Sequence, residues 1–440
     1  MSLVDPDIEA APWAAQSEAD APLYKAQIAH LFDKSRFYRQ KLGAAGFGSS
    51  EDVGGLAAIA SLPLTEKSEL RAGASDDEPL GLHCTATRSD IVRIYSTSGT
   101  TGTPSYIPLT AGDLDVWVRT SSRSYAASGI ERGETIVSTY NAGPFVAGAA
   151  LAAFDRLRLC HVPVGTGNTE RLVTAIAKLK PTAAVLTPSY ALHLVEWADS
   201  RGIDLAQSSV KRVLVAGEPG GGEAAMRASL EAGWGASVTE AMGIGDIGVS
   251  LWGECEAKAG MHFSGRGFVH IELIDPDTGT AIDLTDGAEG ELVLTHLVNR
   301  STPLLRFRTR DHVRVAMGAC PCGRTAPRVR CIGRTDDMLI VRGVNLFPSA
   351  LREVVNEFQP EVTGVLIIRP RAAGVRQDPP LPVAVEVAVP DPAAEGVAGL
   401  AERIRARIRE RLLVTTDVQL VAAGSLPRSE YKSKLVEKPH

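Results

Sequence analysis

Short apolar runs alternate with helical patterns through the middle of the chain. Buried strands are predicted at residues 135–140, 158–163, 183–187 and 212–216. Helices are predicted between them, at 143–154, 169–179 and 190–201; in the second, Leu172, Val173, Ile176 and Leu179 share one face. This alternation predicts an α/β domain with a mainly parallel sheet. Ligands gather at the carboxyl ends of such strands, where Tyr140, Thr187 and Gly217 should lie.

The pattern changes on both sides of this region. Residues 1–20 are acidic and rich in alanine and proline, and we expect them to wrap the surface, while 22–42 have helical spacing. From about 265 to 330, short strands such as 268–274 and 290–295, separated by turns, predict a β-subdomain. Beyond 336 an α+β unit is predicted, with strands near 364–369, 382–389 and 417–422, a helix near 396–413 and a surface loop at 373–382. The sequence thus predicts an N-terminal domain (1–335) and a small C-terminal domain (336–440).

Composition limits the possible partners. The 440 residues are 44% hydrophobic and 22% charged, which is ordinary for a globular protein. A net charge of −6 without a basic patch argues against nucleic acid, and no apolar run reaches the ~18 residues of a membrane span. The N-terminus lacks a signal-peptide layout. We therefore expect a cytoplasmic protein with small-molecule partners, and a homodimer is left open.

A loop rich in glycine and hydroxyl side chains follows the apolar run 91–95. It consists of Ser96, Thr97, Ser98, Gly99, Thr100, Thr101, Gly102, Thr103 and Pro104. Glycines let several N–H groups converge, and hydroxyls add uncharged donors, so the loop suits a polyphosphate. It lacks the lysine of the Walker pattern. A flexible linker is the alternative.

Four further segments follow in fixed order: 305–311, 333–338, 340–348 and 426–432. Together with the loop they resemble the phenylacetate-CoA ligase family, a branch of the adenylate-forming enzymes. The resemblance runs from about Leu23 to Lys432. It implies an AMP-forming acid–CoA ligase that uses ATP, magnesium and coenzyme A to join a carboxylic acid to the thiol through an acyl-adenylate.

The resemblance also implies roles for individual residues. Ser96 to Gly102 would cradle the β- and γ-phosphates, Asp311 would bind the ribose, and Arg334 would lie beside the ribose and α-phosphate. The adenine turn is Gly217, Glu218 and Pro219, and a second nucleotide segment holds Met242 and Gly243. Asp246 would serve magnesium, Lys432 would bridge the acid and the α-phosphate, Asp336 would be the hinge, and Gly343 would line the pantetheine tunnel. The acid pocket should include Tyr140, Phe145, Ala216 and Gly245.

Plainer interpretations exist for several of these residues. Asp311 and Arg334 could form a surface ion pair, residues 217–219 could be an ordinary strand-end turn, and Gly343 could be a kink. The chain also departs from the family pattern. Thr103 replaces a lysine, Asp246 replaces a longer glutamate, Gly245 replaces a hydroxyl residue, and Tyr431 replaces a glycine. The acid is therefore left open between an aryl acid and a small branched or hydroxylated one.

A metal site is predicted from two pairs of ligand residues. Six residues separate Cys255 from His262, and one residue separates Cys320 from Cys322. Three cysteines and a histidine form a standard structural zinc set, and the pairs lie in turn-rich segments. Reduced cysteines in loops are the alternative.

Two other functions compete with the acid–CoA ligase. The enzyme could pass its acyl group to a carrier protein, which would have to be a separate chain. Alternatively, the changes at 103, 245 and 246 could mark a regulator that binds a nucleotide or acyl-adenylate without turnover; retention of Asp311, Asp336 and Lys432 argues against this.

Overall fold

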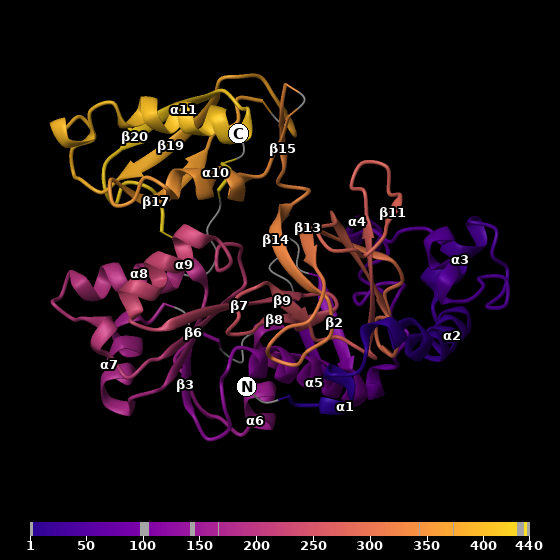
Figure 1. Cartoon of the computed structure of the whole chain (residues 1–440). Coiled ribbons are helices and arrows are strands. Elements are labelled where there is room, and N and C mark those ends of the chain that lie inside the picture. The colour runs from indigo at the N-terminus through magenta and orange to yellow at the C-terminus, as the bar shows by residue number, and fades with distance from the viewer. Residues whose placement is uncertain are drawn as a thin grey trace. The chain divides into compact units, whose positions relative to one another are not determined.

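The computed structural model describes residues 3–96, 105–140, 146–165, 167–342, 344–372, 374–428 and 435–437. The chain forms two compact units, each built from two segments. The first unit comprises Met1–Val185 and Thr239–Arg330, and the second comprises Leu186–Val238 and Cys331–His440 (Figure 1). Both units mix helices with strands, so the predicted α/β class is confirmed. The division at 335/336 stays a prediction.

Parallel strands form one part of the first unit. They are β3 (Thr135–Ser138), β4 (Cys160–Pro163) and β5 (Ala183–Leu186), in the order β5-β3-β4. The helices of this part are α5 (Ala111–Ala127), α6 (Ala149–Arg156) and α7 (Thr169–Leu179). Helix α7 has the predicted bounds, and Leu172, Val173 and Ile176 are buried. Leu179, predicted on the same face, is instead 56% exposed, because the helix ends there and Lys180 turns into the left-handed conformation.

The other strands of the first unit are mostly antiparallel. They pair in the order β11-β10-β12-β13-β14-β9-β8-β7. Their bounds in chain order are β7 (Ser237–Ile244), β8 (Gly248–Glu254), β9 (Met261–Phe263), β10 (Val269–Ile274), β11 (Ala281–Ile282), β12 (Glu289–His296), β13 (Phe307–Ala316) and β14 (Arg328–Arg334). A separate hairpin pairs β1 (Ile91–Ser96) with β2 (Tyr106–Thr110). The strands predicted at 268–274 and 290–295 are observed to within a residue.

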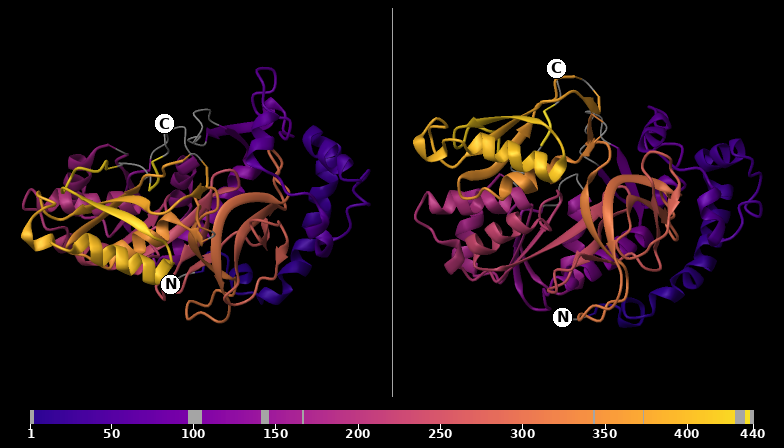
Figure 2. Two further views of the ribbon diagram at one scale, coloured as in Figure 1. Left: turned by 90° about the horizontal axis from the view of Figure 1, so that it is seen from above. Right: turned by 45° about the horizontal axis from the view of Figure 1, so that its top comes forward.

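Helices from the N-terminal part pack beside these strands. They are α1 (Pro6–Glu9), α2 (Gln16–Lys34), α3 (Arg36–Ala44) and α4 (Lys67–Ala72). Figure 2 shows the N-terminal helices, in indigo, beside the orange strands of this unit. Tyr24, Ile28 and Leu31 of α2 share a buried cluster with Leu297 and Leu305, which follow β12. Among the described residues, no helix is both long and apolar enough to span a bilayer.

The prediction that residues 1–20 lie on the surface is wrong in part. Glu9 is 5% exposed and forms a 2.9 Å ion pair with the buried Arg324. Asp5 lies 2.7 Å from Nε of Arg123, whose side chain is fully buried. Buried guanidinium groups need acceptors, and these two carboxylates come from distant positions in the sequence. The composition of the segment therefore could not reveal its burial.

The second unit contains a three-stranded sheet covered by helices. The sheet order is β17-β19-β20, and the strands are β17 (Val362–Ile368), β19 (Leu381–Val387) and β20 (Thr416–Val421). Helices α10 (Pro348–Asn356) and α11 (Leu400–Leu412) lie beside this sheet (Figure 1). They contribute Leu351 and Ile404 to its core. The unit also contains α8 (Pro188–Asp199), β6 (Arg212–Ala216), α9 (Ala224–Trp234), β15 (Leu339–Val341) and β16 (Val344–Leu346).

The prediction that residues 373–382 form a surface loop is wrong in part, because two strands lie within this range. Arg376 and Gln377 form β18, which pairs in parallel with β15, and β19 begins at Leu381. The two-residue strand is too short to give a periodic signal. Its pairing partner lies more than thirty residues away, so only the folded chain defines it.

Candidate active site

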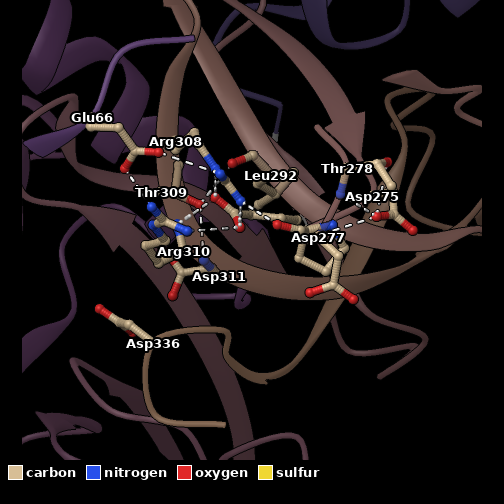
Figure 3. Close-up of polar contacts among 12 residues, drawn as sticks. Glu66, Asp275, Asp277, Thr278, Leu292, Arg308, Thr309, Arg310, Asp311 and Asp336 are labelled. Carbon is tan, nitrogen blue, oxygen red and sulfur yellow. Dashed lines mark hydrogen bonds and ion pairs between the residues drawn. The ribbon is translucent and has the colours of Figure 1, made fainter. Parts of the chain in front are cut away.

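Asp311 lies in β13 on the buried side of the strand and is 8% exposed. The neighbouring Arg308 donates to both carboxylate oxygens of the buried Glu291 on β12, at 2.9 and 2.8 Å. Glu66, just before α4, accepts hydrogen bonds from Arg308 and Arg310, as Figure 3 shows. We call Glu66, Glu291, Arg308 and Arg310 the Glu66 cluster. It fixes the part of β13 that directly precedes Asp311 through charge-assisted bonds.

The segment predicted to face the nucleotide and magnesium lies at the turn from β7 to β8. At Gly243 a Cβ atom would lie 2.0 Å from the Val249 carbonyl oxygen, so any side chain there would clash with backbone. The pairing of the two strands shifts register between Met242 and Ile244. Gly245 and Asp246 follow in the turn. Gly243 therefore permits β7 and β8 to approach closely just before the turn that carries Asp246, the predicted magnesium ligand.

Asp246 is already paired with a cation. Nζ of Lys67, the first residue of α4, lies 2.6 Å from Oδ2 of Asp246. Both residues line a cavity of about 320 Å³, together with Arg71, His83 and Ser105. Burial lowers the pKa of His83 to about 4, so its imidazole is neutral near pH 7. The sequence prediction missed Lys67, Arg71 and His83, because no local motif joins them to a residue 179 positions away from Lys67.

Tyr140, predicted for the acid pocket, follows β3 and is backed by aromatic rings. Its ring stacks on Phe154 with centroids 6.4 Å apart, and Phe154 also contacts Tyr125 at 5.2 Å and His161 at 4.9 Å. The Tyr140 N–H donates to Oγ of Ser138, which lies 2.8 Å from Nε2 of His161. These contacts give Tyr140 a defined position.

In the second unit, the predicted adenine turn follows β6, whose last residue is Ala216. Gly217 has a φ of 96°, a conformation that glycine adopts without strain. The Glu218 carboxylate accepts a 2.7 Å hydrogen bond from the Ser189 N–H at the start of α8. The Pro219 carbonyl accepts from Arg352 of α10 at 2.8 Å. The turn is thus fixed to two helices of its own unit.

Arg334 and Asp336 contact each other through two parallel hydrogen bonds. Nε and Nη2 of Arg334 lie 2.9 and 2.8 Å from the two Asp336 oxygens. Both side chains are largely exposed, so the pair contributes at most about 1 kcal/mol to stability. Arg334, the predicted nucleotide contact, and Asp336, the predicted hinge, are therefore joined by one weak ion pair.

The segment that leads to Lys432 is anchored by a buried carboxylate. Glu386 of β19 accepts from the Leu426 N–H at 3.0 Å and from Arg428 at 2.6 Å. Burial alone would raise the pKa of Glu386, but these hydrogen bonds outweigh it and lower the pKa. Residues 426–428 are therefore held to the sheet of the second unit.

The four predicted metal ligands converge. One potential ligand atom from each of Cys255, His262, Cys320 and Cys322 lies within 4.8 Å of all the others. The sulfurs of Cys255 and Cys320 are 3.5 Å apart, and Cys322 Sγ is 3.3 Å from His262 Nε2. Hydrogen bonds from Cys255 and His262 lower the pKa of the Cys322 thiol. A thiolate beside two further sulfurs and an imidazole suits a zinc ion.

Of the predicted phosphate loop, the structure describes Ser96. It ends β1, is 8% exposed and lies opposite Tyr106 of β2. The residues beyond the description are Thr97, Ser98, Gly99, Thr100, Thr101 and Gly102 of the loop, and also Phe145, Gly343 and Lys432. Their roles stay predictions.

The family model described as AMP-binding enzyme matches residues 19–296. The model described as AMP-binding enzyme C-terminal domain matches residues 343–438.

Curated relatives cover most of the chain. Phenylacetate-coenzyme A ligase of Thermus thermophilus is 33% identical over 97% of both chains. The enzyme of the same name from Aromatoleum evansii is 36% identical over 79% of this chain and 78% of its own. That of Escherichia coli is 30% identical over 92% and 91%.

Solved structures of a related ligase share the fold of nearly the whole chain. A 2-hydroxyisobutyryl-CoA ligase in complex with 2-HIB-AMP, in the postadenylation state, has a TM-score of 0.90 at 26% identity and covers 100% of this chain and 94% of its own. The same ligase with 2-HIB-AMP and CoA, in the thioesterification state, has a TM-score of 0.72 over 99% and 93%. The chain therefore belongs to the phenylacetate-coenzyme A ligase family of AMP-binding enzymes. It is an ATP-dependent acid–CoA ligase.

Proposed function

We propose that this enzyme activates a carboxylic acid in two half-reactions. In the first, a carboxylate oxygen bonds to the α-phosphorus of ATP while the bond to pyrophosphate breaks, which gives an acyl-adenylate. In the second, the sulfur of coenzyme A bonds to the acyl carbon, the thiol proton is lost, and AMP leaves with the electron pair of the broken C–O bond. Family membership supports this order of steps, as do the ligands in the structure of the related 2-hydroxyisobutyryl-CoA ligase, 2-HIB-AMP and CoA.

The observation that carries the proposal is the buried Asp311, held in β13 by the Glu66 cluster. A buried carboxylate accepts hydrogen bonds strongly, and we assign it the two ribose hydroxyls. Met242 and Gly243 are assigned to the nucleotide segment, and the close approach of β7 to β8 at Gly243 fixes the turn that follows. The rigid turn at 217–219 is assigned to adenine, and Arg334 to the ribose and α-phosphate.

Charge stabilisation dominates the first half-reaction, because two anions must meet. We assign Lys432 to bridge the acid carboxylate and the α-phosphate, with residues 96–102 around the outer phosphates. The contact of Glu386 with Arg428 and Leu426 would hold the base of the lysine segment. Asp246 would hold magnesium, which neutralises phosphate charge when bound.

A swing of the C-terminal domain would separate the two half-reactions. We place the boundary between residues 335 and 336, with Asp336 as the hinge and Gly343 lining the pantetheine tunnel after the swing. The largely exposed ion pair of Asp336 with Arg334 supports a hinge here, because breaking it costs little.

The acid is proposed to be an aryl acid or a small branched or hydroxylated one. Curated relatives are named for phenylacetate, whereas the structural relative is named for 2-hydroxyisobutyrate. Tyr140 and its aromatic backing support a defined pocket wall, and Gly245 adds space.

A substrate screen tests the proposed reaction directly. Purified protein would be given arylacetates and short 2-hydroxy acids with ATP and magnesium, first for pyrophosphate release and then for thioester formation with coenzyme A. We expect one class to give both products. Release without a coenzyme A thioester would favour a carrier-protein acceptor, and no release with any acid would contradict the proposal.

We further propose that Cys255, His262, Cys320 and Cys322 hold a structural zinc ion. A tetrahedral zinc with Zn–S bonds of 2.3 Å places its sulfurs about 3.8 Å apart, close to the 3.5 Å between Cys255 and Cys320. Four protein ligands leave no open position, so the ion would clip loops together and take no part in catalysis. Nε2 of His262 lies 3.3 Å from Sγ of Cys322, so this nitrogen faces the site and is the one proposed to bind the ion.

Two further expectations concern the protein as a whole. A cytoplasmic location and a homodimer stay predictions. Cell fractionation tests the first, and light scattering of the purified protein tests the second.

A further inference from the structure

The cavity beside Asp246 carries more positive charge than its one carboxylate needs. Among its lining residues are two cations, Lys67 and Arg71, one carboxylate, Asp246, and the neutral His83. Its volume of about 320 Å³ lies at the lower end of the roughly 300–1,000 Å³ of ligand pockets. An excess of cationic donors in a small cavity favours a compact polyanion.

The cavity is continuous with the predicted phosphate loop along the chain. Ser105, which directly follows the loop, lines the cavity, and Nε of Arg71 lies 3.5 Å from its Oγ. Asp246, the predicted magnesium carboxylate, lines it as well. Residues from three distant segments thus bring cations, a hydroxyl and a carboxylate to one cavity.

Lys67 is rigidly positioned, which an incidental surface lysine would not be. The preceding Thr65 donates its N–H to the Arg306 carbonyl at 2.8 Å, and the Thr65 carbonyl accepts from the Arg308 N–H at 3.0 Å. Glu66 belongs to the Glu66 cluster (Figure 3) and forms a capping box with Glu69 at the start of α4. The backbone of Lys67 is therefore tied to β13, the strand of Asp311.

The side chain of Lys67 remains available to a ligand. It is 32% exposed, while its partner Asp246 is 13% exposed. An ammonium group has three donors, so a contact with one carboxylate oxygen leaves donors for phosphate oxygens. Position 103, where the resembled family has a lysine, is a threonine in this chain.

We propose that Lys67, with Arg71 beside it, binds the pyrophosphate end of ATP and supplies the cation that position 103 lacks. This inference rests on the proposed adenylation reaction. Before ATP binds, Lys67 neutralises and orients Asp246; with ATP bound, its ammonium donates to oxygens of the β- and γ-phosphates.

Binding of magnesium pyrophosphate to the full-length protein, measured by calorimetry, tests the subsite without turnover. Lys67→Ala should weaken this binding about 10-fold or more, since charge-assisted hydrogen bonds are lost, and Lys67→Arg should retain most of it. The matched control is Lys41→Ala. Lys41 of α3 pairs with Glu69 of α4, the helix of Lys67, but does not line the cavity. The Lys41→Ala variant should therefore bind as wild type does.

Kinetics give a second readout in acid-dependent pyrophosphate exchange. Lys67→Ala should raise KM for ATP about 10-fold or more while affinity for AMP stays at the wild-type value. Unchanged pyrophosphate binding in Lys67→Ala would overturn the inference, and so would an equal loss in Lys41→Ala or an equal loss of AMP affinity, which would indicate a structural role. Failure of the proposed function is distinguishable, because the wild-type protein itself would then show no exchange while the calorimetric comparison would still test the subsite.

Discussion

Acid should destabilise the first unit through one buried histidine. His296 ends β12 and is 4% exposed; its Nε2 lies 3.2 Å from the Ile247 carbonyl oxygen, and its Nδ1 accepts from the Leu304 N–H at 3.1 Å. A neutral ring with its proton on Nε2 satisfies both contacts. A second proton on Nδ1 would face the Leu304 N–H donor. Burial accordingly lowers the pKa of His296 to about 4.

The magnitude follows from linkage between protonation and folding. The usual pKa of 6.5 applies to the unfolded chain, so the two states differ by about 2.5 pH units. Between pH 6.5 and 4 the unfolded state binds a proton that the native state does not. The stability contribution of the neutral ring is therefore complete above pH 6.5 and is lost as the pH falls toward 4. At about 1.4 kcal/mol per unit, the loss is about 3 kcal/mol.

Urea denaturation at pH 7, 6, 5 and 4 measures this effect when wild type is compared with His296→Gln. The glutamine cannot be protonated, so other titrating groups cancel in the difference. Wild type should lose about 3 kcal/mol more than the variant between pH 6.5 and 4. Parallel stability curves over that range would refute the reasoning. His296 contacts the Ile247 carbonyl, and Ile247 directly follows Asp246, the predicted magnesium ligand. Activity should therefore fall over the same pH range as stability.

Three other variants test separate parts of the account. Gly243→Ala should cost about 3 kcal/mol or more of stability, because its Cβ would meet backbone at 2.0 Å; Gly112→Ala, with 3.9 Å of clearance, should not, and equal stabilities by urea denaturation would reject the close approach. Cys322→Ser should lower zinc, measured by elemental analysis, from about one per chain and reduce the melting temperature, whereas Cys160→Ser should change neither; well under one zinc in the wild type would reject the site. Asp336→Pro should reduce thioester formation much more than pyrophosphate exchange, and an equal loss would exclude the hinge.

Features whose signal lies within one short stretch of sequence were predicted correctly. Helix α7 and strand β6 have the predicted bounds, because their apolar residues form clear local patterns and a breaker follows each, Pro181 and Gly217. The cysteine and histidine pairs were also found from spacing, since each pair contributes two ligands from one short segment. The structure added that the two pairs meet.

Features that depend on distant partners could not be predicted. Lys67 appears in the sequence as one charged residue at a helix start, and only the fold brings it to Asp246, 179 residues later. Glu9 was likewise assigned to a surface segment, because its partner Arg324 is 315 residues away. Ion pairs of this kind leave no periodic signal.

The most direct test of the central claim is isotope exchange between pyrophosphate and ATP in the absence of coenzyme A. An acyl-adenylate intermediate requires this exchange to depend on the carboxylic acid, and Lys432→Ala should abolish most of it because the two anions lose their bridging cation. Exchange that proceeds without acid, or exchange undiminished in Lys432→Ala, would contradict the account.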